Sequence, residues 1–194
     1  MNSITKQYQW ILIIPSIFKL DRRVFPVGSV IAGVYVKKRW GLCMETINIY
    51  GDNRFARHTK IREACRGIVV KDGNILLSYE VKSDQWMIPG GGVEADEGYE
   101  TCCIRELAEE TGFLVKPLYC YLMINEYYKD YLYLSRYFIC KVVGQTERLL
   151  TERELEEGLE PRWIPLDEAI GIFSEHQNHA LIETKRGMYL REFR

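Results

Sequence analysis

Hydrophobic residues recur along this chain of 194 residues with two periods, one typical of strands and one typical of helices. Apolar runs at 64–70 and 74–81 flank Lys71-Asp72-Gly73, a turn sequence that predicts a β-hairpin. The segment METINIYGD, which begins at Met44, predicts an opening strand and a turn. Further strands are expected at residues 85–88, 114–124, 131–142 and 160–165.

The helical period is clearest at residues 99–110, and Gly112 is well placed to end this helix in the left-handed conformation. The side chains available for burial on it are Cys103, Ile104, Leu107 and Ala108. Two more helices are expected at residues 166–173 and 178–193. This order of elements suits an α/β protein with a mixed sheet covered by helices, although periodicity alone does not separate it from other α+β folds.

Composition agrees with one small domain, because 47% of the residues are apolar and supply a core. The formal net charge of −1 gives no global field that would attract nucleic acid or an anionic membrane. The cysteines show no C-x-x-C pair, so buried thiols in a reducing cytoplasm are expected rather than a zinc site. They are Cys43, Cys65, Cys102, Cys103, Cys120 and Cys140. His176 and His179 have no third ligand nearby and are interpreted as a partly exposed polar pair.

Candidate chemistry is concentrated between Pro89 and the end of the predicted helix at 99–110. The glycines that follow Pro89 allow sharp turns and a close approach of the main chain to a ligand. Glu106, Glu109 and Glu110 stand at i, i+3 and i+4, so they share one helix face. Their mutual repulsion, near the negative end of the helix dipole, is relieved by a divalent cation. Oxygen ligands suit Mg²⁺, with Mn²⁺ as a second option, whereas the alternative is a solvated acidic face.

Residues 91–113 read GGVEADEGYETCCIRELAEETGF and fill every fixed position of a Nudix box, from Gly91 through Glu97 to the run Arg105–Phe113. The chain therefore resembles the Nudix hydrolases. The resemblance implies an α/β/α sandwich around a mixed sheet. It also implies metal-dependent hydrolysis of the pyrophosphate linkage of a nucleoside diphosphate derivative, by attack of water on phosphorus.

The resemblance further implies roles for single residues of the box. Glu106, Glu109 and Glu110 would bind Mg²⁺ or Mn²⁺, with the Gly90 carbonyl as a weaker ligand. Arg105 and Glu97 would form an ion pair that ties the glycine-rich loop to the helix.

The general base is the least certain assignment, because family members use either a box glutamate such as Glu106 or a later carboxylate. Glu126 and the run at Glu152, Glu154, Glu156 and Glu157 are the later candidates. The run, with Glu154 and Glu156 as its representatives, is favoured because a mobile loop can close over substrate. A carboxylate near a strand end is more often fixed by packing.

Substrate contacts are assigned to Arg66, Gly91, Gly92 and Tyr128. The tyrosines at 127, 128, 131 and 133 offer rings for stacking on a base, although cross-strand packing is the favoured interpretation. Trp86 is interpreted as a packing anchor. Arg66 is as readily a strand-surface charge as a phosphate ligand.

Two rival functions come from related proteins: a nucleotide-sensing Nudix module without turnover, and an isoprenoid isomerase. The first normally has a DNA-binding partner domain, and neither end of the chain shows a helix-turn-helix. The second differs in its metal and acid residues from a full box. Intact box carboxylates favour a hydrolase of a small-molecule nucleotide in the cytoplasm, without nucleic-acid binding or a membrane span, and with a homodimer as one option for assembly.

The N-terminal part of the chain differs in charge from the rest. Residues 1–43 contain seven Lys or Arg and one Asp, whereas 44–194 contain nineteen basic and twenty-six acidic residues. The apolar runs at 10–18 and 24–36 are shorter than the roughly 18 to 20 residues of a membrane span. A signal or membrane-associating segment and an accessory element remain open. The favoured interpretation is a leader or over-extended reading frame before a natural start at Met44, with 44–194 as the Nudix hydrolase domain.

Overall fold

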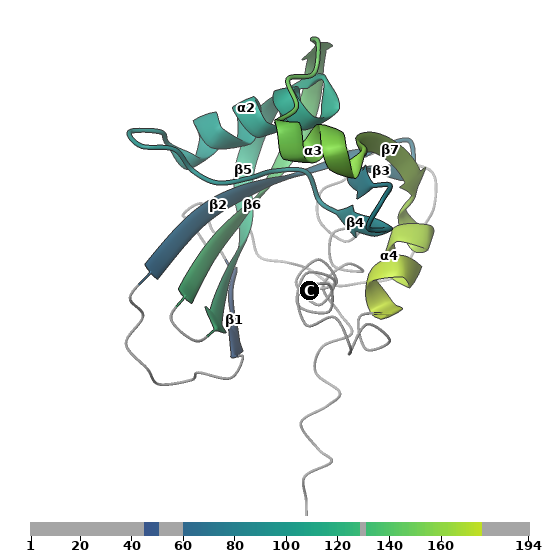
Figure 1. Ribbon diagram of the computed structural model, residues 1–194. Coiled ribbons are helices and arrows are strands. Elements are labelled where there is room, and N and C mark those ends of the chain that lie inside the picture. Colours follow the sequence, from purple (N-terminus) through teal and green to yellow (C-terminus); the bar gives the residue numbers. More distant parts are fainter. Residues whose placement is uncertain (1–44, 51–59, 129–130, 176–194) are drawn as a thin grey trace, which may run out of the picture.

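Seven strands form one mixed sheet that divides into two arms beyond the hairpin of β2 (Lys60–Lys71) and β3 (Asn74–Glu80) (Figure 1). The computed structural model describes residues 45–50, 60–128 and 131–175. The remaining strands are β1 (Glu45–Tyr50), β4 (Gln85–Met87), β5 (Phe113–Tyr128), β6 (Tyr131–Gln145) and β7 (Leu159–Pro165). The helices are α2 (Tyr99–Thr111), α3 (Glu152–Glu157) and α4 (Leu166–Ser174).

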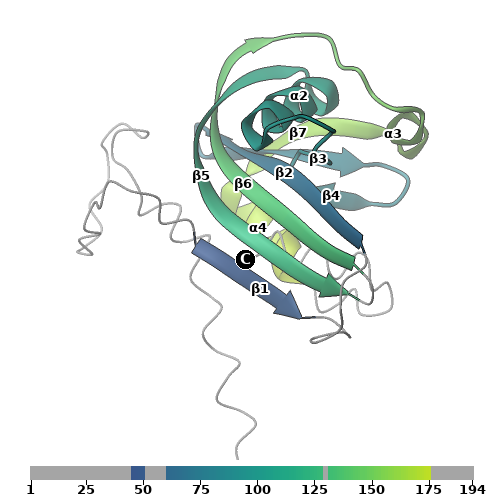
Figure 2. The same ribbon diagram turned by 90° about the vertical axis from the view of Figure 1, so that its left-hand side faces the viewer.

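One arm consists of β1, β5, β6 and β2, which lie side by side in Figure 2. β1 is parallel to β5 and β2 is parallel to β6, whereas β5 and β6 are antiparallel. The other arm pairs β3 with β4 and β7, both antiparallel. β2 and β3 pair only at Val70 with Ile75 and at Lys71 with Asn74, so the arms diverge directly after the hairpin.

The edge of β2 that faces away from β6 is occupied by residues 89–93, which we call the glycine loop. The Cys65 amide donates to the Gly91 carbonyl at 3.0 Å, and the Gly67 amide donates to the Pro89 carbonyl at 2.9 Å. Farther along, the Val93 amide donates to the Glu63 carbonyl at 3.1 Å. The glycine loop is therefore held like an additional strand, at the point where the arms separate.

Two apolar cores lie on opposite faces of the sheet, each under one helix (Figure 1). Cys103 and Leu107 of α2 pack on one face with residues that include Val69, Leu76 and Phe138. On the other face, α4 packs against residues from both arms. Those residues include Ile68, Leu77, Ile124 and Tyr137. This arrangement confirms the predicted mixed sheet with helices on both sides.

Helix α2 ends as the sequence predicts. Gly112 has a φ of 73°, and its amide donates to the Ala108 carbonyl at 3.0 Å. The buried face of α2 differs in part from the expectation, since Ile104 is 39% exposed. Cys102 is fully buried in its place, because α2 is rotated so that this side chain meets Cys65 of β2.

The predicted strands are confirmed: β2, β5, β6 and β7 are longer than predicted, whereas β3 and β4 each end one residue earlier. The helix predicted at 166–173 is α4. The run 152–157, expected to be a mobile loop, is instead helix α3, because Thr151 and Glu154 form a complete capping box at its start. The predicted helix at 178–193, both interpreted histidines and residues 1–43 lie outside the described residues, so the Met44 boundary stays a prediction. Among the described helices, none combines the length and the hydrophobicity that crossing a bilayer requires.

Candidate active site

Arg105 lies at the centre of the site and connects α2 to the glycine loop. Its Nε and Nη2 atoms donate to Oε1 and Oε2 of Glu97, each at 2.9 Å, which is a bidentate contact. Nη2 also donates to the Gly92 carbonyl at 3.1 Å. The Glu94 amide donates to Glu97 at 3.1 Å from the other side. The ion pair that the resemblance implies is therefore present, and it fixes the loop to the helix.

The same guanidinium contacts two of the three helix glutamates, as we call Glu106, Glu109 and Glu110. Nη1 of Arg105 donates to Glu106 Oε1 at 2.9 Å and to Glu109 Oε2 at 3.0 Å. The hydrogen bonds from Arg105 to Glu97, and the charges of the two helix glutamates, raise the pKa of Arg105 above its usual value. Arg105 thus supplies the positive charge that this acidic face otherwise lacks.

Glu110 is the buried member of the helix glutamates, with 5% of its surface exposed. Its Oε2 accepts hydrogen bonds from Ser78 Oγ at 2.7 Å and from the Gly90 amide at 3.3 Å. Burial raises the pKa of Glu110 to about 8, although the Ser78 hydrogen bond and the charge of Arg66 oppose this shift. Without a further cation, Glu110 is therefore largely protonated at neutral pH.

The glycines of the loop allow the main chain to approach the helix glutamates closely. A Cβ atom on Gly91 would collide with the carboxylate of Glu106. Gly90 has a φ of 142°, and a Cβ there would collide with the main chain of Cys65. Burial, more than any neighbouring charge, raises the pKa of Glu106. Side-chain-free residues at 90 and 91 are thus a steric requirement of the site.

The helix glutamates fit a hard divalent cation by the chemistry of their donors. All three offer carboxylate oxygens, and burial raises the pKa values of Glu106 and Glu110, so a bound cation would offset the cost of ionising them. The described residues contain no ready-made cluster of three metal-ligating side chains, since Arg105 holds two of the glutamates and Ser78 contacts the third. A bound ion would therefore have to replace some of these contacts.

The candidate bases are placed differently from one another. Glu154 lies close enough to Glu106 for its charge to raise the pKa of that residue. Its carboxylate accepts a hydrogen bond from the Thr151 amide at 2.8 Å, so it also caps α3. Glu156 is exposed on the same helix. Glu126 is 3% exposed on β5 and stands opposite Tyr133.

Arg66, the glycine loop and Trp86 all lie near the point where the arms separate. Nη1 of Arg66 donates to the Ile88 carbonyl at 2.6 Å, and its charge lowers the pKa of Glu110. Trp86 packs on Tyr79 with ring centroids 4.4 Å apart and on the core under α4, as expected of a packing anchor. Tyr128 pairs with Tyr131 across β5 and β6, and its side chain lies outside the described part of the structure.

Sequence reasoning missed two features of the site. Ser78, the partner of Glu110, carries no sequence signal because the contact depends on how β3 diverges from β2. Helix α3 did have a signal, since a threonine followed three residues later by a glutamate marks a helix start and Gly158 marks its end. Arg153 of α3 holds it near β3 through a 3.1 Å contact with Glu80.

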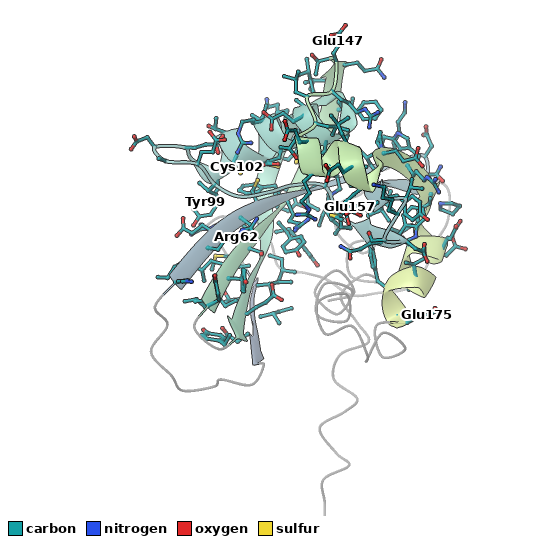
Figure 3. The ribbon with its side chains drawn as sticks, viewed as in Figure 1. Arg62, Tyr99, Cys102, Glu147, Glu157 and Glu175 are labelled. Carbon is teal, nitrogen blue, oxygen red and sulfur yellow. The ribbon has the colours of Figure 1, made fainter. Side chains whose placement is uncertain are left out.

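The thiols under α2 form two pairs in the core (Figure 3 labels Cys102). The Sγ atoms of Cys65 and Cys102 are 2.8 Å apart, and those of Cys103 and Cys140 are 3.6 Å apart. Cys102 Sγ also contacts the Gly92 carbonyl at 3.4 Å. The contact with Cys65, together with burial, raises the pKa of Cys102, so this thiol stays protonated. The five described cysteines are free, in agreement with the expectation of buried thiols.

Comparison with known proteins places this geometry in context. The family model described as the NUDIX domain matches residues 62–185. The chain is 34% identical to the mRNA-decapping enzyme subunit 2 of Saccharomyces cerevisiae (strain YJM789) over 85 residues, which are 42% of this chain and 8% of that protein. It is 28% identical to the diphosphoinositol polyphosphate phosphohydrolase 3-alpha of Mus musculus over 107 residues, 55% of this chain and 63% of that protein. It thus spans less than two thirds of either relative.

A solved structure, the NUDIX hydrolase from Nitrosomonas europaea, is also similar to this chain. The TM-score is 0.49 and the sequence identity is 20%, over 68% of this chain and 87% of that one.

Proposed function

Because the chain belongs to the Nudix family, we propose that it is a pyrophosphohydrolase, in which water attacks a phosphorus of a phosphoric anhydride. The observation that carries this proposal is the convergence of three glutamates from one face of α2, the bidentate Arg105 and a sterically closed glycine loop. With a divalent cation held by the glutamates, such a constellation would bind and polarise an anionic phosphate chain.

Glu106, Glu109 and Glu110 would hold Mg²⁺ or Mn²⁺, with the Gly90 carbonyl as an additional oxygen ligand. When bound, the ion would neutralise phosphate oxygens and make water more acidic. Arg105 keeps the loop at a fixed distance from α2 through Glu97 and the Gly92 carbonyl. Gly90 and Gly91 bring the main chain of the loop close to this arrangement because they carry no side chains of their own.

We assign the proton transfer to Glu154, because it is the later carboxylate whose charge reaches Glu106. Glu156 is the second candidate on the same helix. Glu126 is buried in β5, which favours a fixed structural role. Arg66 is assigned a phosphate contact, which is supported by its position beside the Ile88 carbonyl and by the effect of its charge on Glu110. Gly91 and Gly92 of the loop are assigned the same role.

The substrate class we propose is a nucleoside diphosphate derivative. A direct test measures the release of phosphate or nucleoside monophosphate from a panel of nucleotides, with Mg²⁺ and with excess EDTA. Turnover should require the metal, and Glu110→Gln should abolish most of it. Glu147→Gln is the matched control, because Glu147, labelled in Figure 3, is an exposed acid to which no role in the site is assigned. Tight nucleotide binding without turnover would instead indicate a sensing module.

A further inference from the structure

Basic residues and tyrosines face each other along β2 and β6 on the sheet face that is opposite α2. Lys60, Arg62 and Arg66 alternate along β2, and the register places them beside Tyr131, Tyr133 and Tyr137 of β6. Tyr137 and Ile68, the next alternate residue of β2, belong to the core under α4, which fixes the face on which these side chains lie. We call Lys60, Arg62, Tyr131 and Tyr133 the tyrosine–cation stripe.

Exposure increases along β6 away from the core. Tyr137 is 2% exposed, whereas Tyr131 at the start of the strand is 37% exposed. Lys60 and Arg62 are exposed as well. The outer end of the stripe is therefore in contact with solvent, while its inner end joins the core.

The two tyrosines are already arranged as a stacking surface. The rings of Tyr131 and Tyr133 are 5.4 Å apart between centroids and inclined by only 13°. Lys60 Nζ lies 5.0 Å from the Tyr131 centroid and 3.3 Å from its hydroxyl. An exposed ammonium on a ring is held more weakly than a stacked base, so an incoming base is able to displace Lys60 from this position.

In residues 45–50, 60–128 and 131–175, neither Lys60 nor Arg62 forms an ion pair. Like charges at alternate positions of one strand face repel each other unless an anion lies between them. A ligand that carries both negative charge and an aromatic ring can pair its charge with Lys60 and Arg62 and stack its ring on the tyrosines of the stripe.

The stripe also reaches the glycine loop. Nη2 of Arg62 lies 3.9 Å from the position that a Cβ on Gly92 would occupy. The carbonyl of Gly92 in turn accepts a hydrogen bond from Arg105 at 3.1 Å. Figure 3 shows Arg62 on the β2 arm, away from Glu157 of α3. A ligand bound at Arg62 thus lies next to the loop that Arg105 fixes.

We propose that the tyrosine–cation stripe is a subsite for the nucleoside part of the substrate. The base stacks on Tyr131, backed by Tyr133, and Lys60 and Arg62 contact its phosphates on the side towards the glycine loop. This inference rests on the proposed hydrolase function and adds to it that a base-bearing ligand is preferred over a phosphate-only one. Tyr131 is the residue that determines this preference.

The test compares two non-hydrolysable ligands in Mg²⁺, α,β-methylene-ADP and methylenediphosphonate, which share the bridged phosphates but differ in the nucleoside. The full chain should bind the nucleotide about tenfold more tightly. Tyr131→Leu should abolish this preference while leaving the affinity for methylenediphosphonate unchanged, which also shows that the variant is folded. Tyr131→Phe should retain the preference. Tyr119→Leu, which changes an exposed tyrosine of β5, is the matched control.

The outcomes separate the inference from the proposed function. Equal affinity for both ligands in the unmodified chain, or a preference that survives Tyr131→Leu and Tyr133→Leu, would overturn the subsite while turnover of nucleotides still supported the hydrolase. Absence of binding to both ligands, together with absence of metal-dependent turnover, would overturn both.

Discussion

Arg105 and Glu97 are joined by two parallel hydrogen bonds of 2.9 Å, which connect α2 to a loop residue eight positions earlier in the chain. Because Arg105 also contacts Glu106, Glu109 and the Gly92 carbonyl, one side chain fixes both the loop and the acidic face of the helix. Structure and proposed chemistry therefore depend on the same guanidinium.

Arg105→Lys tests whether the site depends on the positive charge of residue 105 or on the planar shape of its guanidinium. Lysine keeps the positive charge but has no planar fork, so it cannot maintain the bidentate contact with Glu97. We expect a loss of about 1–3 kcal/mol in the free energy of unfolding, measured by urea denaturation, together with a fall in kcat. Arg153→Lys is the control, since the Arg153 side chain is mostly exposed and its single contact with Glu80 at 3.1 Å should contribute less than about 1 kcal/mol. Equal losses in the two variants would contradict the central role of Arg105.

The metal-free protein should become less stable as the pH rises from about 4.5 to about 8. In this range folded Glu110 keeps a proton that the unfolded chain has released, because its pKa is raised to about 8. The stabilising effect is complete below the unfolded pKa and is lost as the pH rises through the folded one. In EDTA, the free energy of unfolding should therefore be lower at pH 8 than at pH 5.5 by an amount on the order of a few kcal/mol, which is seen as a lower Tm at pH 8.

Glu110→Gln is the control for this pH dependence, and in this variant the stability in EDTA should change less between pH 5.5 and pH 8. Mg²⁺ should raise the Tm of the unmodified chain more at pH 8 than at pH 5.5, since a ligand carboxylate must lose its proton. A Mg²⁺ effect independent of pH would argue against Glu110 as a ligand.

Substitutions in α3 test whether Glu154 is the general base or only completes the N-terminal cap of this helix. Gln at this position can still complete the capping box, so Glu154→Gln should leave Tm nearly unchanged while lowering kcat by about 100-fold or more. Thr151→Ala should do the reverse, costing about 1 kcal/mol of stability with little effect on chemistry. Normal kcat in all five Gln variants, at Glu126, Glu152, Glu154, Glu156 and Glu157, would move the base into the box, to Glu106.

Gly91→Ala tests the close approach of loop and helix. The new methyl group would collide with the Glu106 carboxylate, so we expect a loss of about 1–3 kcal/mol in stability and a weakened response of Tm to Mg²⁺. Gly171→Ala, in α4, is the matched control because nothing lies within 4 Å of the added atom. That variant should be more stable by about 0.5–1 kcal/mol. Unchanged stability and an unchanged response of Tm to Mg²⁺ in Gly91→Ala would show that the site accommodates a methyl group at this position.

Much of the fold was predictable because local rules decide it. The Lys71-Asp72-Gly73 turn specifies the β2–β3 hairpin, and Gly112 specifies the end of α2. The interpretation of 152–157 as a loop was wrong for a local reason, since the threonine–glutamate capping box was overlooked.

The contacts of Glu110 were not predictable in the same way. Its spacing in the chain indicates a metal ligand, but its burial and its bond to Ser78 depend on two strands that diverge after only two residue pairs. No sequence period encodes that divergence. The stacking of Tyr131 on Tyr133 depends likewise on which face of β6 stays uncovered.

The strand-like pairing of the glycine loop with β2 has a consequence for how this chain tolerates changes in length. Three main-chain hydrogen bonds fix residues 89, 91 and 93 in register with β2. Inserting or deleting one residue there would shift every later residue by one pleat and turn Gly91 away from Glu106. In the exposed turn at Lys82–Asp84, the Lys82 amide donates to the Glu157 carbonyl at 3.1 Å, so a tag or label inserted after Lys82 is expected to be tolerated better than one in the glycine loop.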